Sequence, residues 1–244
     1  MYQFFVEDEQ VSEDSISIIG GDVNHIKNVL RMKCGEGIRI SDKSGKSYFC
    51  HIEGMNDEEV LAHIDEVDEK GTELTNKIYL FQGLPKNEKM ELIIQKAVEL
   101  GVFEIIPVAM RHCVVKLDEK KASGKVARWK AIAESAAKQS KRTVIPEVTM
   151  PLTYRQAMDK AASLDVILVP YENERGMEAT RQVLSNIQQG ESIGIFIGPE
   201  GGFSEDEITG LAAGAHRISL GRRILRTETA GLAALAMLVY ELDD

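Results

Sequence analysis

The 244-residue chain has little of several features that define particular classes of protein. Its three cysteines, Cys34, Cys50 and Cys113, show no CxxC or Cys/His spacing, which excludes a disulfide scaffold and predicts buried free thiols in a reducing compartment. The most apolar stretch, residues 230–240, is too short to cross a bilayer and predicts a helix buried on nearly all sides. The first ten residues lack the pattern of a signal peptide. These absences predict a cytoplasmic protein without a membrane segment.

Motifs that carry common chemistries are also absent. The five histidines are scattered, and no pair has the i, i+4 spacing of a helical metal site, so we expect no metal. There is no GxGxxG after a strand and no GxxxxGK[ST], which argues against a dinucleotide site and a P-loop. Nothing resembles GxSxG or HExxH, so hydrolytic chemistry also loses support.

Charge is distributed unevenly along the chain. The formal net charge is −10, which taken alone argues against nucleic acid as a partner. Residues 1–75 carry this whole excess, with 7 basic and 17 acidic side chains, whereas residues 76–244 hold 22 of each. Basic islands occur at residues 27–46, 111–142 and 217–226. They could form a track for a phosphate backbone, and the alternative is that they are solvated helix faces.

The apolar pattern divides the chain into two parts. Residues 1–75 contain short strand patterns at 38–41, 47–52 and 60–64, and a helix at 22–32 with Asp22 as a possible cap. From residue 76, strands at 78–82, 103–109, 166–169, 193–197 and 217–220 alternate with helices at 89–100, 125–140, 154–162, 177–187, 205–213 and 229–242. This alternation predicts an α/β fold whose mostly parallel sheet is covered by helices on both faces. The boundary falls in the polar stretch 65–76.

The most informative segment is a glycine-rich turn that follows the strand at 193–197. It reads Gly198-Pro199-Glu200-Gly201-Gly202, and the next helix opens with a capping box of Ser204 and Glu207. Glycines let a flat ligand or another chain segment approach the backbone closely. Because ligands of α/β sheets bind at the carboxyl ends of strands, we interpret this turn as a ligand loop. The alternative is a tight connection that needs only turn residues.

Two further strand ends resemble this one. Residues 220–230 place Arg222, Arg223 and Arg226 in a turn before a helix, where they would be costly to desolvate without anions. Arg226 and Glu228 could instead form only a structural ion pair. With the strand end at residues 168–172, these loops predict a site walled by backbone amides and apolar side chains, which suits an adenosine-bearing ligand better than a triphosphate.

Together these segments resemble the RsmE family of ribosomal RNA methyltransferases in the SPOUT superfamily. The resemblance rests on motifs that stay in order along nearly the whole chain, of which GPEGG followed by LGxxILRxETA is the most specific. The others are HIxxVLR at residues 25–31, GLPK at 83–86, QKAVELG at 95–101, RW at 128–129 and QSxR at 139–142. The resemblance implies a PUA-like β-barrel that binds RNA at residues 1–72, and an α/β domain with a trefoil knot at residues 73–244. It also implies a homodimer.

The resemblance further implies the activity and its residues. The activity would be S-adenosylmethionine (SAM)-dependent methylation at N3 of one uridine in 16S ribosomal RNA of the small subunit. RNA contacts are expected at His25, Arg31, Lys86, Arg111, Gln139, Arg142, Arg222 and Arg223. The cofactor is expected to contact Leu168, Val169, Tyr171, Ile197, Gly198, Pro199, Glu200, Gly201, Gly202, Leu220, Gly221, Ile224, Leu225, Arg226, Thr229 and Ala230. Departures from the family pattern occur at Gln3, where an arginine is common nearby, and at Cys113, where a serine is common.

The chemistry of this reaction suggests roles for four residues. The enzyme must align an in-line attack and favour the uridine N3 anion, whose charge spreads onto the flanking carbonyl oxygens. Arg226 and Arg142 are the candidates for stabilising that charge, and Glu200 or Glu228 for orienting the base or accepting its proton. Two other functions stay open. One is ribose 2′-O methylation by a related SPOUT enzyme, and the other is a non-catalytic ribosome-assembly factor.

Overall fold

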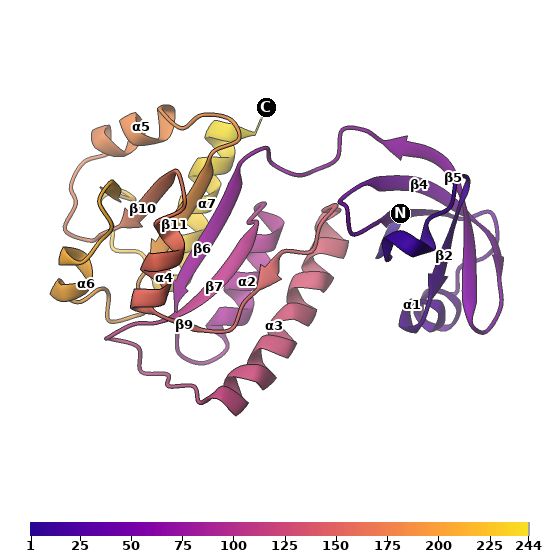
Figure 1. The fold of residues 1–244 in the computed structure, drawn as a ribbon, viewed down its shortest axis with the longest axis horizontal. Coiled ribbons are helices and arrows are strands. Elements are labelled where there is room, and N and C mark those ends of the chain that lie inside the picture. The colour runs from indigo at the N-terminus through magenta and orange to yellow at the C-terminus, as the bar shows by residue number, and fades with distance from the viewer. Residues whose placement is uncertain (244) are drawn as a thin grey trace. The chain divides into compact units, whose positions relative to one another are not determined.

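The computed structural model describes residues 1–243; Asp244, the last residue of the expected second domain, lies outside the described residues. The chain forms two compact units (Figure 1). The first comprises Met1–Glu73 together with Ala137–Ile145, and the second comprises Leu74–Ala136 and the chain from Pro146 onward. Residues 137–145 thus pack with the first unit although they lie later in the sequence.

The first unit is built on a five-stranded sheet in the order β1-β3-β4-β5-β2. Strands β1 and β3 are parallel and the other pairs are antiparallel. In β2, Ile16 and Ile18 are buried and the residues between and beside them are not, which is the period-two pattern of a strand with one face in the core. The strands are β1 (Tyr2–Phe5), β2 (Ser15–Ile19), β3 (Gly37–Ser41), β4 (Ser47–Met55) and β5 (Glu59–Asp68), and a short 3-10 helix spans Asp8–Gln10.

The helix expected at residues 22–32 differs from the prediction. It begins as α1 (Gly21–Asn24) and continues as a π-helix over His25–Leu30. Its N-cap is Gly20, with φ of 73°, and the predicted cap Asp22 instead pairs with Lys138 at 3.2 Å. The segment ends at Arg31 in the left-handed conformation, with φ of 55°. A helical period predicts neither the wider turn nor this termination.

A buried ion pair holds residues 137–145 in the first unit. The Arg142 side chain is buried, and its Nε lies 3.2 and 3.1 Å from the two Glu73 carboxylate oxygens. The backbone N–H of Thr143 also donates to Glu73, at 2.9 Å. Gln3 donates from its amide to the carbonyl oxygen of Arg142. The Glu73 contacts join segments about 70 residues apart in sequence, and the Gln3 contact joins residues that are 139 positions apart.

The second unit contains a seven-stranded sheet in which every pair is parallel. The order is β12-β10-β11-β6-β7-β8, and β9 pairs with β7. This confirms the predicted α/β class. The strands are β6 (Lys77–Gly83), β7 (Glu104–Ala109), β8 (Glu147–Val148), β9 (Leu152–Thr153), β10 (Val166–Pro170), β11 (Ser192–Ile197) and β12 (Ala215–Ile218). The two-residue strands β8 and β9 are too short to show an apolar pattern, so the sequence did not predict them.

Helices cover both faces of this sheet. On one face, Phe81 and Phe196 stack with ring centroids 4.3 Å apart and join a core that includes Ala157 of α4. On the other, Gly231 of α7 lies against Leu80 and Ile197. Helices α2 and α7 pack against each other behind the sheet (Figure 1). The helices are α2 (Lys89–Glu99), α3 (Glu119–Ser140), α4 (Tyr154–Ala161), α5 (Glu178–Ser185), α6 (Glu205–Thr209) and α7 (Thr227–Leu242).

Some expected details of burial and length are wrong. The C-terminal helix α7 is not buried on nearly all sides, because Tyr240 is 88% exposed. Helix α6 ends at Thr209 rather than at residue 213, and Cys34 is exposed rather than buried. Among the helices of residues 1–243, none combines the length and apolar character that crossing a bilayer requires.

Candidate active site at the carboxyl edge of the sheet

A cavity of about 340 Å³ lies where the loops after β10, β11 and β12 meet. Because these strands are parallel, their carboxyl ends share one edge of the sheet, and the loops that follow them converge there. Apolar side chains and backbone form much of the wall, and charged side chains form the rest. The lining residues are Lys89, Pro170, Tyr171, Glu172, Glu174, Arg175, Ile197, Gly198, Pro199, Glu200, Gly202, Phe203, Ser219, Leu220, Gly221, Arg222, Arg223, Ile224, Leu225, Arg226, Thr227 and Ala230.

Close backbone packing explains the glycines of the 198–202 loop. A Cβ on Gly83 would lie 2.7 Å from the backbone nitrogen of Pro199, so this loop packs directly on the end of β6. Gly202 has φ of 67°, a conformation that L side chains rarely adopt. The predicted capping box is confirmed, since Ser204 accepts from the N–H of Glu207 and the Glu207 carboxylate accepts from the N–H of Ser204.

Buried hydrogen bonds fix this loop to the start of α7. The Thr227 hydroxyl donates to the carbonyl oxygen of Gly198 at 2.7 Å. The same hydroxyl accepts from the side-chain amide of Gln82, at 2.9 Å. Gln82 is fully buried and Thr227 nearly so. One wall of the cavity is therefore held by contacts among β6, the 198–202 loop and α7.

Two carboxylates beside the cavity share one ammonium group. Lys89 Nζ lies 3.0 Å from Glu200 Oε1 and 3.2 Å from Glu228 Oε2. The backbone N–H of Lys86 also donates to Glu200 Oε1, at 3.1 Å. Burial alone would raise the pKa of Glu200, but the hydrogen bonds from Lys89 and from backbone N–H groups outweigh it, so the pKa is lowered. The pKa of Lys89 is raised, chiefly by its hydrogen bond to Glu200. Both groups are therefore charged at neutral pH.

Four arginines on the cavity wall lack acidic partners. Arg175, Arg222, Arg223 and Arg226 are exposed and line the cavity. Among residues 1–243, no hydrogen bond or ion pair of their side chains is found. The alternative interpretation of Arg226, an ion pair with Glu228, is not observed, since Glu228 pairs with Lys89. Unpaired guanidinium groups beside a cavity are well placed to bind an anion.

The structure brings most of the expected cofactor residues to the cavity. Leu168 and Val169 are fully buried within β10, and Gly201 and Thr229 are not among the lining residues. Gly201 instead packs against His112, whose Nδ1 lies 2.9 Å from the Gly201 carbonyl oxygen. The expected residues that line the cavity are Tyr171, Ile197, Gly198, Pro199, Glu200, Gly202, Leu220, Gly221, Ile224, Leu225, Arg226 and Ala230.

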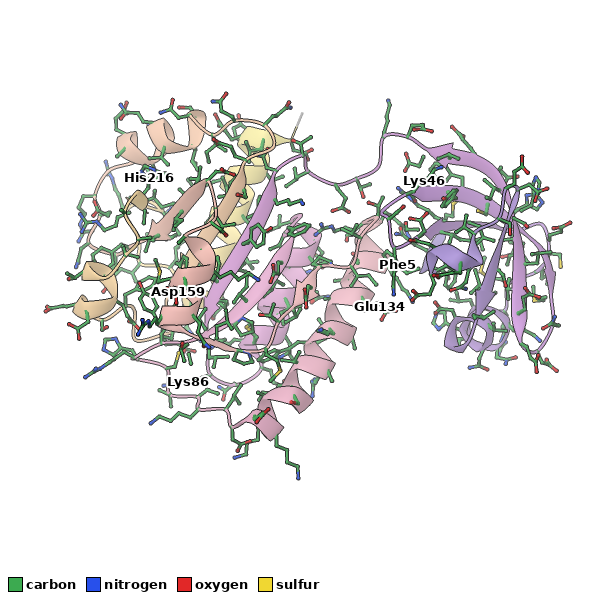
Figure 2. The ribbon with its side chains drawn as sticks, viewed as in Figure 1. Phe5, Lys46, Lys86, Glu134, Asp159 and His216 are labelled. Carbon is green, nitrogen blue, oxygen red and sulfur yellow. The ribbon has the colours of Figure 1, made fainter. Side chains whose placement is uncertain are left out.

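The residues expected to contact RNA have different environments. Lys86 is exposed in the segment that joins β6 to α2 (Figure 2), and Arg222 and Arg223 line the cavity. Arg142 is the exception to the general exposure of this group, because its guanidinium is buried on Glu73. Arg142 is also not among the residues that line the cavity. The other exposed members are His25, Arg31, Arg111 and Gln139.

Sequence reasoning missed several residues of this site. Lys89, Thr227 and Gln82 carry its polar contacts, yet each belongs to an ordinary helix or strand pattern. A hydrogen-bonded threonine at a helix start leaves no distinctive spacing in the sequence. Arg175 could have been noticed as a basic residue just beyond the third strand end, at residues 168–172. Within residues 1–243, no group of three or more histidine, cysteine, aspartate or glutamate side chains is arranged to hold a metal ion.

The fold and the cavity define an α/β protein that binds a compact ligand at a sheet edge flanked by basic side chains. Residues 72–239 match the model of the RNA methyltransferase domain family, and residues 18–65 match that of the RNA methyltransferase PUA domain. The chain belongs to this RNA methyltransferase family, which confirms the resemblance drawn from its motifs.

Known proteins resemble the chain over almost its full length. Ribosomal RNA small subunit methyltransferase E of Bacillus subtilis strain 168 is 38% identical, and the match covers 99% of this chain and 97% of that protein. The solved structure of the Neisseria gonorrhoeae protein of the same name, bound to S-adenosyl methionine, has a TM-score of 0.83 at 32% identity and covers 98% and 97% of the two chains. A Legionella pneumophila methyltransferase in complex with SAM has a TM-score of 0.84 at 31% identity, with the same coverage.

Proposed function

We propose that this protein is a SAM-dependent methyltransferase that modifies N3 of one uridine in 16S ribosomal RNA of the small subunit. The observation that carries the proposal is the cavity at the carboxyl edge of the sheet, with glycine-rich loops on one wall and unpaired arginines on another. The relatives named above act on small-subunit ribosomal RNA or are bound to SAM.

The cavity fits SAM in size and chemistry. Its volume of about 340 Å³ is within the usual range for small-molecule sites. Ile197, Leu220 and Leu225 offer apolar contacts, and the backbone of the 198–202 loop forms a wall against which a flat base would lie. The other residues that would hold the cofactor are the predicted cofactor residues that line the cavity. When bound there, SAM supplies a methyl group on a sulfonium sulfur that needs no further activation.

Arg226 is the residue best suited to favour the reactive form of uridine. Loss of the N3 proton leaves a negative charge on the ring, spread over N3 and the flanking carbonyl oxygens. A guanidinium that lines the cavity and has no acidic partner stabilises such a charge more effectively than one that is already neutralised. We assign Arg226 this catalytic role. Arg142 is a weaker candidate for this role, because Glu73 of the same chain neutralises its charge.

The two carboxylates differ in their suitability as proton acceptors. Glu200 is a poor base because its pKa is lowered. Glu228 Oε2 is buried and lacks a hydrogen bond among residues 1–243, although Lys89 lies 3.2 Å away as an ion pair. Glu228 does not line the cavity, so it would receive the N3 proton only through a bridging water molecule. Glu200 would remain an anion that orients neighbouring groups.

The expected RNA contacts complete the proposal. Arg222 and Arg223 would meet phosphates next to the target nucleotide, and the first unit, with His25 and Arg31 exposed, would bind RNA as a PUA-like β-barrel. The domain limits 1–72 and 73–244, the SPOUT trefoil knot and the cytoplasmic location belong to the same proposal. The homodimer is also part of this proposal, and its interface would cover the exposed Tyr240 of α7.

The test is methyl transfer to RNA. The protein is incubated with methyl-labelled SAM and small ribosomal subunits that lack the modification, and the RNA is digested and analysed by mass spectrometry. We expect one N3-methyluridine per 16S RNA. A label on a ribose 2′ oxygen would instead identify the alternative transferase activity. Binding of subunits without any transfer would identify an assembly factor.

A further inference from the structure

Lys89, which has no role in the proposed mechanism, is the centre of a charged cluster beside the cavity. This residue is the first of α2, and its ammonium contacts Glu200 of the 198–202 loop and Glu228 in the first turn of α7. All three side chains are mostly shielded from solvent, with exposed fractions of 24% for Lys89, 26% for Glu200 and 17% for Glu228. One cation therefore joins three separate elements of the second unit.

The position of the cluster links it to the cavity wall. Lys89 and Glu200 line the cavity, whereas Glu228 is not among the lining residues. Glu228 therefore forms an anchor behind the wall, at a helix N-terminus where a negative charge is favourable. Lys89 connects Glu228 to Glu200, because it also donates to the Glu200 carboxylate. The N–H of Lys86 donates to the same carboxylate. The position of Glu200 thus depends on α2 as well as on its own loop.

The charges make the cluster sensitive to loss of the ammonium. With Lys89 present, two carboxylates and one cation leave a single net negative charge. Without it, Glu200 and Glu228 would both be partly buried carboxylates deprived of their shared counter-ion, an arrangement that is costly. The Glu200 side chain would then leave its place or take up a proton, and the backbone of the 198–202 loop would shift with it.

We propose that Lys89 is a positioning residue that sets cofactor affinity by holding Glu200, and with it the 198–202 loop, against α7. The inference rests on the proposed function, because it takes the cavity to be the SAM site. Lys89 acts on the ligand through the loop and not through its own charge. Affinity for SAM and affinity for S-adenosylhomocysteine, which lacks the sulfonium charge, should therefore depend on it equally.

The experiment is titration calorimetry of the full chain with SAM and with S-adenosylhomocysteine. We expect Lys89→Met to weaken both ligands by the same factor, about 10- to 100-fold, as for loss of a charge-assisted hydrogen bond. Lys89→Arg should remain within about threefold of wild type, since it keeps the cation. Lys96→Met is the matched control. It removes an ion pair with Glu99 on the same helix, outside the cavity, and should change neither affinity.

Two further measurements separate positioning from a general effect on folding. Binding to wild type should be constant between about pH 6 and pH 8, because Glu200 stays ionised and Lys89 stays protonated. In Lys89→Met the pKa of Glu200 rises, so binding should begin to weaken at a higher pH than in wild type as the solution is made more acidic. Adding Glu228→Gln to Lys89→Met should recover part of the affinity by removing one of the two repelling charges. A purely structural role would produce neither effect.

The outcomes distinguish this inference from the function on which it rests. If wild-type protein bound neither ligand, the proposed function would fail first. If wild type bound both ligands and Lys89→Met bound them equally well, only the inference would be overturned. A change in affinity that SAM shows and S-adenosylhomocysteine does not would also overturn it. A selective gain for SAM, for example, would mean that the ammonium acts directly on the sulfonium charge by repulsion.

Discussion

The two basic segments at residues 111–142 and 217–226 have different surroundings. In the first, five basic side chains are paired with carboxylates: Lys121, Arg128, Lys130, Lys138 and Arg142. In the second, Arg217 pairs with Glu174, whereas Arg222, Arg223 and Arg226 line a cavity and have no such partner among residues 1–243. A count of charges along the sequence treats the two segments alike. Ion pairs occupy half of the basic side chains of the first segment, whereas three arginines of the second have no acidic partner and lie together at a cavity, which makes them the stronger candidates for binding anions.

The largest difference is expected between the two arginines considered for the same role. Arg226→Ala should lower kcat by about 100-fold, the usual effect of removing one group that stabilises charge in the transition state. The unfolding midpoint should stay close to wild type, since no interaction of the Arg226 side chain is lost from residues 1–243. Single-turnover methylation and thermal unfolding measure the two effects. A wild-type rate in a folded Arg226→Ala protein would remove Arg226 from the mechanism.

Arg142→Ala should affect the stability of the fold more than it affects catalysis. The substitution leaves the Glu73 carboxylate without its buried counter-ion and should reduce the free energy of unfolding by roughly 3 kcal/mol. Urea denaturation of the full chain measures this loss. A variant with wild-type stability and a 100-fold lower kcat would contradict the structural role given to the Arg142 and Glu73 pair.

Charge reversal compares the two segments as RNA contacts. The double variant Arg222→Glu and Arg223→Glu should weaken RNA binding by about 10-fold or more and reduce its dependence on salt, while SAM affinity changes little. The matched control, Arg128→Glu with Lys130→Glu, reverses two charges that already have acidic partners. We expect a smaller effect from it. Filter binding at several salt concentrations measures the RNA affinity of both double variants. Equal losses of affinity would mean that ion pairing does not determine which segment binds RNA.

A smaller effect is expected for glycines near and far from the cavity. Gly83→Ala would bring a Cβ within 2.7 Å of backbone at Pro199, so the 198–202 loop must move and SAM affinity should fall. Gly124→Ala, in the basic helix α3, meets no atom within 4 Å and should stabilise the protein by up to about 1 kcal/mol. Calorimetric titration and thermal unfolding of both variants measure the difference. Similar behaviour of the two would argue against close packing at Gly83.

The fold class could be predicted from the sequence because its pattern is local. The strands at 78–82 and 193–197 and the helix at 89–100 are long apolar patterns with turn residues between them, and the structure has them within one or two residues. Strands β1 and β2 were missed. Short strands carry weak apolar periodicity, and the pairing that stabilises these two comes from β3 and β5, more distant in sequence. The π-helix at His25–Leu30 also has no sequence signature.

The site could be predicted only in part for the same physical reason. Gly198, Gly202 and Gly221 signalled a ligand loop because a backbone that approaches closely or has positive φ requires glycine. Lys89 and Thr227 gave no signal, since their importance comes from partners more than 25 residues away. The burial of Arg142 on Glu73 could not be foreseen either. Nothing in the local sequence of either residue indicates that they meet.

The central claim is that the cavity at the carboxyl edge of the sheet serves methyl transfer to a uridine base. The most direct test is mass spectrometry of 16S RNA after unmodified small subunits react with SAM in the presence of wild-type protein or of Arg226→Ala. We predict one N3-methyluridine with wild type and a roughly 100-fold slower appearance with the variant. Transfer by both proteins at the same rate, or a methyl group found only on ribose, would contradict this account.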